Sequence, residues 1–196
     1  PVEVNKKQEE TLLWDTAHLQ GFKIPIGMDN FRNVIYWNLE NNSTPHMLIC
    51  GATGSGKSVS IRSTIEYAKA AGIGQIIMLD PKYEFCDVEG LSCYNEIEDI
   101  ERVMASLVNE MNVRVRTKQK GPMTLVIIDE FADAIAQARS GKALDGERSL
   151  EENLRILAQK GRSVGFRIVA ATQRASTKII TGDTKVNFPV QVCFRV

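Results

Sequence analysis

The sequence lacks the features of a secreted, membrane-spanning or uniformly charged protein. Its 196 residues carry 24 basic and 24 acidic side chains, and this balance excludes a uniformly basic coat for nucleic acid or an acidic tail. No apolar run approaches the ~20 residues of a membrane-spanning helix, and no signal-peptide pattern is present. We therefore expect a soluble, cytoplasmic chain. Because the chain starts at Pro1 without a methionine, the sequence leaves open whether it belongs to a longer protein with a membrane tether outside this chain.

The chain also has few metal-binding side chains, and their spacing is wrong for a metal site. None of the four cysteines belongs to a CxxC pair, and the two histidines, His18 and His46, are not placed to complete a zinc site. Cys50 and Cys193 lie inside apolar runs, which is typical of small buried side chains. The sequence therefore predicts reduced cysteines and neither a disulfide framework nor structural zinc.

Hydrophobic residues make up 43% of the chain, which is enough for a globular core. Residues 1–20 are mostly polar and predict a linker or a docking helix, and residues 21–196 predict one domain. The domain starts with two strands around a turn, at 22–27 and 34–39, which predict a short β-hairpin. Further strands are predicted at 47–50, 76–79, 125–128, 167–171 and 190–194, with helices to about residue 71, over 96–118 and over 150–163. Apolar strands separated by helices predict an α/β fold, with a mostly parallel central sheet and helices on both faces.

The charges balance in total but are segregated along the chain. Residues 80–101 hold eight acidic side chains against one lysine, whereas residues 155–178 hold six basic side chains and no acidic one. Such segregation can steer a polyanion to one surface even at zero net charge. The alternative is an ordinary solvated surface without a partner.

Residues 51–58 read GATGSGKS and match the phosphate-binding motif G-x-x-x-x-G-K-[ST] at every fixed position. An apolar strand precedes the motif and a helix follows it, as the motif requires. Its glycines allow consecutive backbone N–H groups to face phosphates, Lys57 can reach the β- and γ-phosphates, and the Ser58 hydroxyl can bind Mg²⁺. The predicted nucleotide-binding residues are Gly51, Ala52, Thr53, Gly54, Ser55, Gly56, Lys57, Ser58 and Val59.

Two acidic residues complete the predicted nucleotide site. Asp129 and Glu130 follow the apolar run 125–128, and ligands of open α/β sheets bind at such strand ends. We expect Asp129 to hold Mg²⁺ through its water shell and Glu130 to orient or deprotonate the attacking water. A glutamate beside the Mg²⁺ aspartate favours an ATPase over a signalling GTPase, which relies on a glutamine and an external arginine. Gln173, at the tip of a later strand, can sense the γ-phosphate.

Five segments resemble, in order, the motor-domain motifs of the FtsK/SpoIIIE DNA translocases. They are PHMLICGATGSGKSV (45–59), IIMLDPK (76–82), IIDEFAD (127–133), LAQKGRSVGFRIVAATQR (157–174) and IITGDTKVNFP (179–189). The resemblance runs from Ile24 to Val196. It implies a RecA-like P-loop ATPase core that assembles into hexameric rings and pumps double-stranded DNA through a central channel, using ATP and Mg²⁺.

The resemblance also assigns roles to single residues. Arg162 matches the arginine that reaches the nucleotide of the neighbouring subunit, so it is expected to act in trans. An ion pair with a nearby acidic side chain, Glu151 or Glu152, is the alternative. The positions that match DNA-backbone contacts in the channel loops are Thr172, Arg174 and Lys185. Arg174 and Lys185 alternatively only keep a loop soluble.

The chain departs from the family pattern in several places. Ala175 replaces the usual proline, the stretch between Lys57 and Asp129 is shorter than in cellular chromosome pumps, and no winged-helix domain is present. The family core continues past Val196, so we expect an incomplete core at the C-terminus. The predicted function is ATP-driven translocation of double-stranded DNA. The alternatives are a related ring ATPase for conjugative transfer, viral genome packaging or protein secretion, and a nucleotide-dependent scaffold with little turnover.

Overall fold

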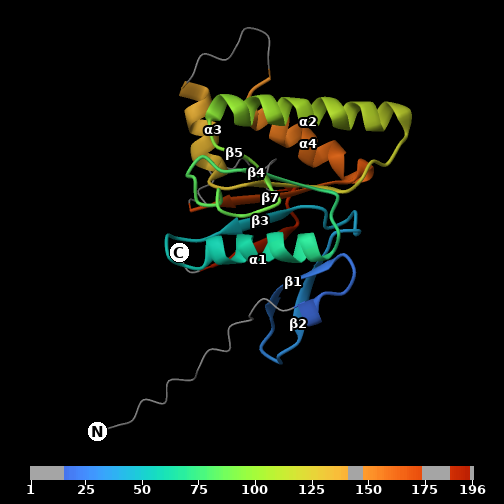
Figure 1. Cartoon of the computed structure of the whole chain (residues 1–196), viewed down its shortest axis with the longest axis vertical. Coiled ribbons are helices and arrows are strands. Elements are labelled where there is room, and N and C mark those ends of the chain that lie inside the picture. Colours follow the sequence, from blue (N-terminus) through green and yellow to red (C-terminus); the bar gives the residue numbers. More distant parts are fainter. Residues whose placement is uncertain (1–15, 141–147, 174–185, 195–196) are drawn as a thin grey trace.

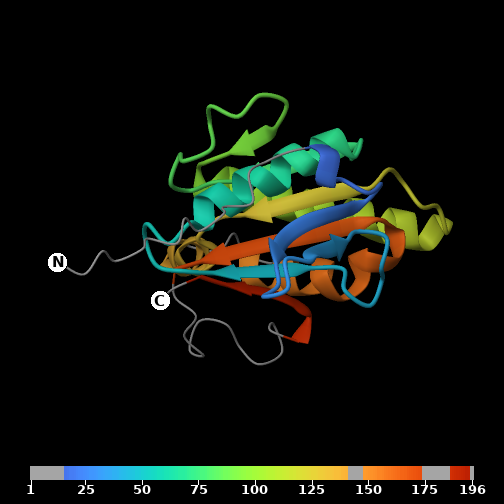
Figure 2. The same cartoon turned by 90° about the horizontal axis from the view of Figure 1, so that it is seen from below.

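The computed structural model of the chain describes residues 16–140, 148–173 and 186–194, and its centre is a parallel β-sheet covered by helices (Figure 1). Six strands of the described residues form this sheet in the order β5-β4-β6-β7-β3-β8, and every neighbouring pair is parallel (Figure 2). The strands are β3 (Met47–Cys50), β4 (Gln75–Leu79), β5 (Ser92–Tyr94), β6 (Thr124–Ile128), β7 (Phe166–Thr172) and β8 (Val190–Cys193). The predicted fold class is therefore confirmed.

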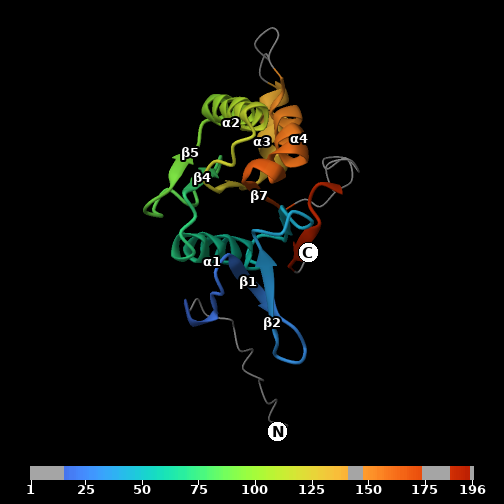
Figure 3. The same ribbon diagram turned by 90° about the vertical axis from the view of Figure 1, so that its right-hand side faces the viewer.

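Helices cover both faces of the sheet, because its inner strands are apolar on both sides (Figure 3). On one face lies α1 (Lys57–Ala70), and on the other lie α2 (Ile97–Thr117), α3 (Phe131–Ser140) and α4 (Leu150–Lys160). Alternate residues of β6 serve the two cores: Leu125 and Ile127 pack on the side of α1, while Val126 and Ile128 pack on the side of α2 and α4. This alternation produces uninterrupted apolar strands in the sequence.

The predicted hairpin is also confirmed, and it packs against α1. Its strands, β1 (Lys23–Met28) and β2 (Val34–Asn38), pair antiparallel. The Asp29 carboxylate accepts the backbone N–H groups of Phe31 and Asn33, both at 2.8 Å, and so closes the turn. Ile24 and Trp37 are buried in the core beneath α1. The hairpin therefore extends one of the two cores rather than standing apart.

Two buried arginines fasten the 3₁₀ turn η2 (Gly161–Val164), which joins α4 to β7. The guanidinium of Arg167 donates to the backbone carbonyls of Arg162, Phe166 and Leu39. Arg114 of α2 donates to the carbonyl of Val164 at 3.0 Å and lies 4.5 Å from the ring centroid of Phe166. The carbonyls of Leu39, Arg162 and Val164 lie outside the β-strands, and these bonds satisfy them.

The structure differs from the predicted elements in three places. Strand β5 and helix α3 were not predicted, and the helix expected over 150–163 ends at Lys160 and continues as η2. Cys193, expected to be buried, is exposed because β8 is an edge strand. The chain division at residue 20 stays a prediction, since residues 1–15 lie outside the described ranges. A short 3₁₀ turn, η1 (Thr16–His18), starts the described part, in which no helix is long and apolar enough for a bilayer.

Candidate active site

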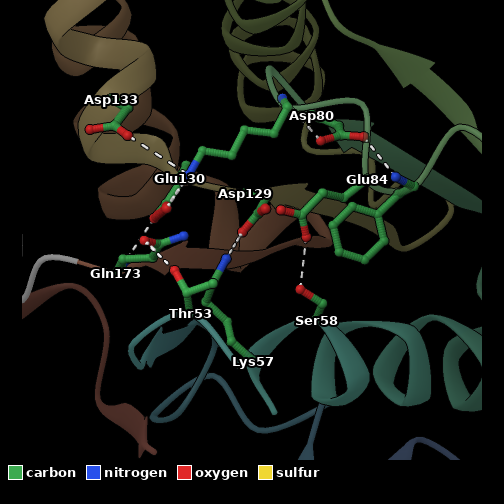
Figure 4. A network of polar contacts seen from close by, with 11 residues as sticks. Thr53, Lys57, Ser58, Asp80, Glu84, Asp129, Glu130, Asp133 and Gln173 are labelled. Atoms are coloured by element: carbon green, nitrogen blue, oxygen red, sulfur yellow. Dashed lines mark hydrogen bonds and ion pairs between the residues drawn. The ribbon is translucent and has the colours of Figure 1, made fainter. Parts of the chain in front are cut away.

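Four neighbouring strands end at the same edge of the sheet and bring the predicted site residues together. Cys50 of β3 pairs with Thr172 of β7, and Leu79 of β4 pairs with Ile128 of β6. Because these strands are parallel and in register, the residues that follow them meet at one edge. They are Gly51, Asp80, Asp129 and Gln173, and Figure 4 labels the last three.

The segment after β3 folds into the expected anion cradle. Gly54 and Gly56 have φ angles of 76° and 105°, a left-handed conformation that favours glycine. At Gly51 an added Cβ would lie 2.4 Å from Ser55 Oγ and 2.8 Å from Phe194 Cβ, so only glycine fits. Helix α1 begins directly behind, at Lys57, and the N–H groups of its first turn have no carbonyl partner within the helix. This arrangement suits a bound polyphosphate.

Lys57 and Asp129 form a buried ion pair, although 72 residues separate them in the sequence (Figure 4). Their side chains are only 5% and 0% exposed. Burial raises the pKa of the Asp129 carboxyl, and the ammonium group of Lys57 opposes that rise. The pair places the phosphate-binding lysine directly beside the predicted Mg²⁺ aspartate.

Two buried oxygens in the described residues have no hydrogen-bond partner, and both lie in the predicted nucleotide site. They are Ser55 Oγ and Asp129 Oδ2. Buried polar atoms are rarely left unpaired, and a free carboxylate oxygen is the kind of group that a hydrated Mg²⁺ ion contacts. Ser58 Oγ donates to Glu84 Oε2 at 2.8 Å, so the carboxylate of Glu84 also lies beside the phosphate loop. The residues present therefore fit Mg²⁺ with a nucleotide phosphate.

Glu130 is held by hydrogen bonds to both of its carboxylate oxygens. Oε2 accepts from Lys82 Nζ at 2.7 Å, and Oε1 accepts from the backbone N–H of Gln173 at 2.5 Å. The side-chain carbonyl of Gln173 accepts from the Thr53 hydroxyl at 3.0 Å (Figure 4). A continuous polar chain thus runs from the phosphate loop through Gln173 to Glu130. Glu130 itself is 2% exposed and has a positive φ of 45°.

The loop between β4 and β5 supplies Lys82 and Glu84 to this site, and α1 fastens it. The guanidinium of Arg62 donates to Asp87 Oδ1 at 2.9 Å and to the carbonyl of Glu84 at 2.6 Å. It also lies 5.2 Å from the ring centroid of Phe85. The loop and the helix behind the phosphate loop are therefore connected.

A cluster of Asp80, Cys86 and Cys93 joins the β4–β5 loop to strand β5, with one ligand atom from each residue within 4.8 Å of the others. The carboxylate of Asp80 accepts the backbone N–H groups of Phe85 at 2.8 Å and Lys82 at 3.3 Å. Burial raises the pKa of the Cys93 thiol to about 11, so it stays protonated near neutral pH. The hydrogen bonds of Asp80 therefore hold the start of this loop in place.

The residues predicted from the resemblance are distributed more widely than those of the phosphate loop. Arg162 is exposed in η2, at the opposite end of β7 from Gln173, and its Nη1 donates to the carbonyl of Asn42 at 3.4 Å. Thr172 is 1% exposed, so its buried side chain does not present itself to DNA as predicted. Arg174 and Lys185 lie outside the described residues.

In the described part of the basic segment, residues 155–173, one of the basic side chains is buried. Arg167 is 3% exposed, and its guanidinium donates to backbone carbonyls inside the protein, so it cannot contribute to a surface for polyanions.

Val59, predicted among the nucleotide-binding residues, is 65% exposed on the first turns of α1.

The sequence did not identify Lys82, Glu84 or Phe194 as site residues. The available signal for Lys82 was its position in Asp80-Pro81-Lys82 directly after an apolar run, because strand ends of this sheet carry the site. Phe194 follows β8 and lies against the glycines of the phosphate loop, with its ring 3.6 Å from the place of a Cβ on Gly56. Only the strand order reveals that contact.

Comparison with known proteins gives a family match and DNA translocases among the relatives. The sequence profile described as "FtsK/SpoIIIE family" matches residues 7–117, more than half of the chain. The DNA translocase FtsK of Borreliella burgdorferi is 31% identical, in a match that covers 100% of this chain and 28% of that protein. The DNA translocase FtsK of Treponema pallidum is 33% identical, over 78% of this chain and 22% of that protein. The chain thus spans about a quarter of the length of these relatives.

Solved structures confirm the architecture. The pCW3 conjugation coupling protein TcpA, solved with ATPγS, superimposes with a TM-score of 0.75 at 26% identity, over 92% of this chain and 56% of that chain. The type VII secretion ATPase EccC of Thermomonospora curvata has a TM-score of 0.72 at 20% identity, over 89% of this chain and 24% of that chain, and supports the fold alone. The fold and the family profile agree, and this chain belongs to the FtsK/SpoIIIE family.

Proposed function

We propose that this chain is the ATP-hydrolysing motor core of a DNA translocase, which works in the cytoplasm as a hexameric ring on double-stranded DNA. The observation that carries the proposal is the polar chain from Thr53 through Gln173 to Glu130, beside the Lys57–Asp129 pair. It joins a phosphate-binding loop to a carboxylate that can act as a general base. Membership of the FtsK/SpoIIIE family and the likeness to TcpA support DNA as the cargo.

The proposed reaction uses groups that this edge of the sheet provides. The amides of the phosphate loop and Lys57 would bind the β- and γ-phosphates of ATP. Mg²⁺ at Ser58 and, through water, at Asp129 would neutralise phosphate charge. Glu130 would orient a water for attack on the γ-phosphorus and accept a proton from that water. The bond between the γ-phosphorus and the oxygen that bridges to the β-phosphate would break, and ADP would leave. The buried position of Glu130 limits its exchange with bulk water.

Gln173 is the proposed link between the reaction and the DNA. Its side chain contacts the phosphate loop, its N–H contacts Glu130, and residues 174–185 follow it in the sequence. Loss of the γ-phosphate would alter these two bonds and so move the segment that carries Arg174 and Lys185. Those two residues are the proposed contacts to the DNA backbone, where charge rather than base sequence is recognised.

Arg162 is proposed to complete the site of a neighbouring subunit. The seven residues of β7 separate its turn from Gln173, which amounts to about 23 Å at ~3.3 Å per residue. Arg162 is therefore too far from the phosphate loop of its own chain. An exposed arginine at this end of the sheet is free to reach a second subunit, where it would stabilise charge on the transferred phosphoryl group.

ATP hydrolysis with and without long double-stranded DNA tests the proposal. We expect stimulation by DNA that weakens as salt increases, because phosphate contacts release counterions. The double variant Arg174→Ala/Lys185→Ala should lose the stimulation and keep ATP binding, and Lys118→Ala/Lys120→Ala, on the α2–β6 connection, is the matched control. A rate of hydrolysis that is the same with and without DNA would indicate a protein cargo instead. Tight ATP binding without hydrolysis would indicate a scaffold.

A further inference from the structure

We propose that Lys82 is a positioning residue for the proposed general base, and that it holds the Glu130 carboxylate in its reactive orientation. This inference rests on the proposed ATPase function and adds a residue that acts through Glu130. The contact that motivates it is the bond of 2.7 Å between Lys82 Nζ and Glu130 Oε2.

Each of the two adjacent carboxylates after β6 has a lysine of its own. Asp129 and Glu130 are adjacent in the sequence, and both are buried. Lys57 pairs with Asp129, and Lys82 pairs with Glu130. A buried carboxylate without a cation is strongly disfavoured, and here a second carboxylate lies next to it. The Lys82 ammonium therefore provides the charge that lets Glu130 occupy this place without engaging the phosphate-binding lysine.

The orientation of the carboxylate is defined by two donors from different parts of the chain. Lys82 approaches Oε2 from the β4–β5 loop, and the N–H of Gln173 approaches Oε1 from the end of β7. Two hydrogen bonds at the two oxygens fix the rotation of the carboxylate plane as well as its position. Reaction rates depend steeply on such positioning, so a loss of one donor should appear in the chemical step.

Lys82 is itself held in place. Its backbone N–H donates to the buried carboxylate of Asp80, and Arg62 of α1 fastens the rest of the loop. Its ammonium group also lies 3.9 Å from Asp133 Oδ2, on the first turn of α3. A lysine with a fastened backbone and two acidic neighbours has little freedom to turn toward solvent. This differs from a surface ion pair, in which both side chains are mobile and contribute little.

The experiment compares Lys82→Met and Lys82→Arg with the wild-type protein, in ATP hydrolysis and in binding of a fluorescent ATP analogue. We expect Lys82→Met to lower kcat by about 10²-fold, within the range for a misplaced general base, with KM and analogue binding changed less than threefold. Lys82→Arg should restore most of kcat, because it supplies a cation to Glu130. Lys69→Met is the matched control: that lysine is 29% exposed against 33% for Lys82, and it pairs with Glu66 away from the site.

A second variant decides whether Lys82 acts through Glu130. In a Glu130→Gln background, which is expected to bind ATP without turnover, Lys82→Met should leave binding of the analogue unchanged. If Lys82→Met impaired analogue binding there, Lys82 would touch the nucleotide and the inference would be overturned. If Lys82→Met does not fold, as judged by thermal melting, Lys82→Gln serves instead, because its shorter neutral side chain should also lose kcat.

The outcomes separate this inference from the proposed function. A wild-type protein that binds the ATP analogue without hydrolysing ATP would contradict the proposed function itself. A wild-type protein that hydrolyses ATP, together with a Lys82→Met variant of unchanged kcat, would leave the function intact and overturn the role of Lys82.

Discussion

The hydroxyl of Thr53 donates a hydrogen bond of 3.0 Å to the side chain of Gln173, 120 residues further along the sequence. This bond joins the phosphate loop to the strand end that precedes residues 174–185. The backbone N–H of Gln173 is in turn bonded to Glu130. One residue thus contacts both the phosphate loop and the proposed general base.

The bond between Thr53 and Gln173 predicts how Thr53→Val will behave. A neutral hydrogen bond contributes ~1 kcal/mol, so we expect stimulation of hydrolysis by DNA to fall by about three- to tenfold. Hydrolysis without DNA should change less than that, because Lys57 and Glu130 keep their partners. Thr117→Val is the control, since the Thr117 hydroxyl bonds to the carbonyl of Val113 within α2. Equal stimulation of Thr53→Val and wild type would show that this bond does not transmit the signal.

The position of Arg162 predicts complementation between two inactive variants. Arg162→Ala should lower hydrolysis by ~10³-fold or more if it acts as an arginine finger, and Glu130→Gln should abolish turnover while ATP binding persists. A mixture of the two should regain activity, because some interfaces combine an intact Glu130 with an intact Arg162. Arg102→Ala, which removes an exposed arginine paired with Asp99 on α2, should remain active alone. A mixture as inactive as its components would exclude a role of Arg162 in trans.

His46 predicts a loss of stability in mild acid. The ring is fully buried, its Nε2 lies 2.8 Å from the carbonyl of Ala158, and its Nδ1 accepts the N–H of Ile168 at 3.0 Å. Both contacts require one neutral tautomer, and a proton on Nδ1 would face that N–H group. Burial, the largest cause, lowers the pKa of His46 from 6.5 to about 4.

The unfolded chain therefore binds a proton near pH 6.5 that the folded chain accepts only near pH 4. The free energy of unfolding should fall as the pH decreases through this window, by about 3 kcal/mol in total, and should be fully regained above it. Denaturant unfolding at several pH values measures this. His46→Gln should be less stable at neutral pH and lose the slope, while His18→Gln should keep it. A wild-type slope of zero between pH 6.5 and 4 would contradict the assignment.

The central sheet could be predicted because its strands are apolar on both faces. No polar residue interrupts Leu125 to Ile128, so the run predicts a buried parallel strand before any contact is known. Strand β5 could not be found in this way, because Ser92–Tyr94 is three residues long and partly exposed. Helix α3 begins at Phe131, immediately after the two acidic residues of the site, so no separate turn in the sequence marks its start.

The phosphate loop could be predicted as a whole, because its residues are contiguous and the left-handed backbone of the loop requires glycines. The partners of Glu130 could not, since Lys82 lies 48 residues away and reaches it only through the order of β4 and β6 in the sheet. Burial also escaped prediction at Thr172, which looks polar in the sequence but packs at a strand end. Residue type predicts what a side chain can do, whereas topology decides what it meets.

Strand β7 has a mechanical consequence for a ring of such subunits. Its first residues are tied to a stiff turn, because Arg114 and Arg167 bind the carbonyls of η2, and its last residue precedes Gln173. If Arg162 engages a neighbour as proposed, one rigid rod has the neighbour's nucleotide at one end and its own at the other. A tilt of β7 at one end must then change the position of its other end, because the strand between them does not bend. In the proposed ring, the nucleotide states of adjacent subunits would therefore be coupled, because a single strand belongs to two sites.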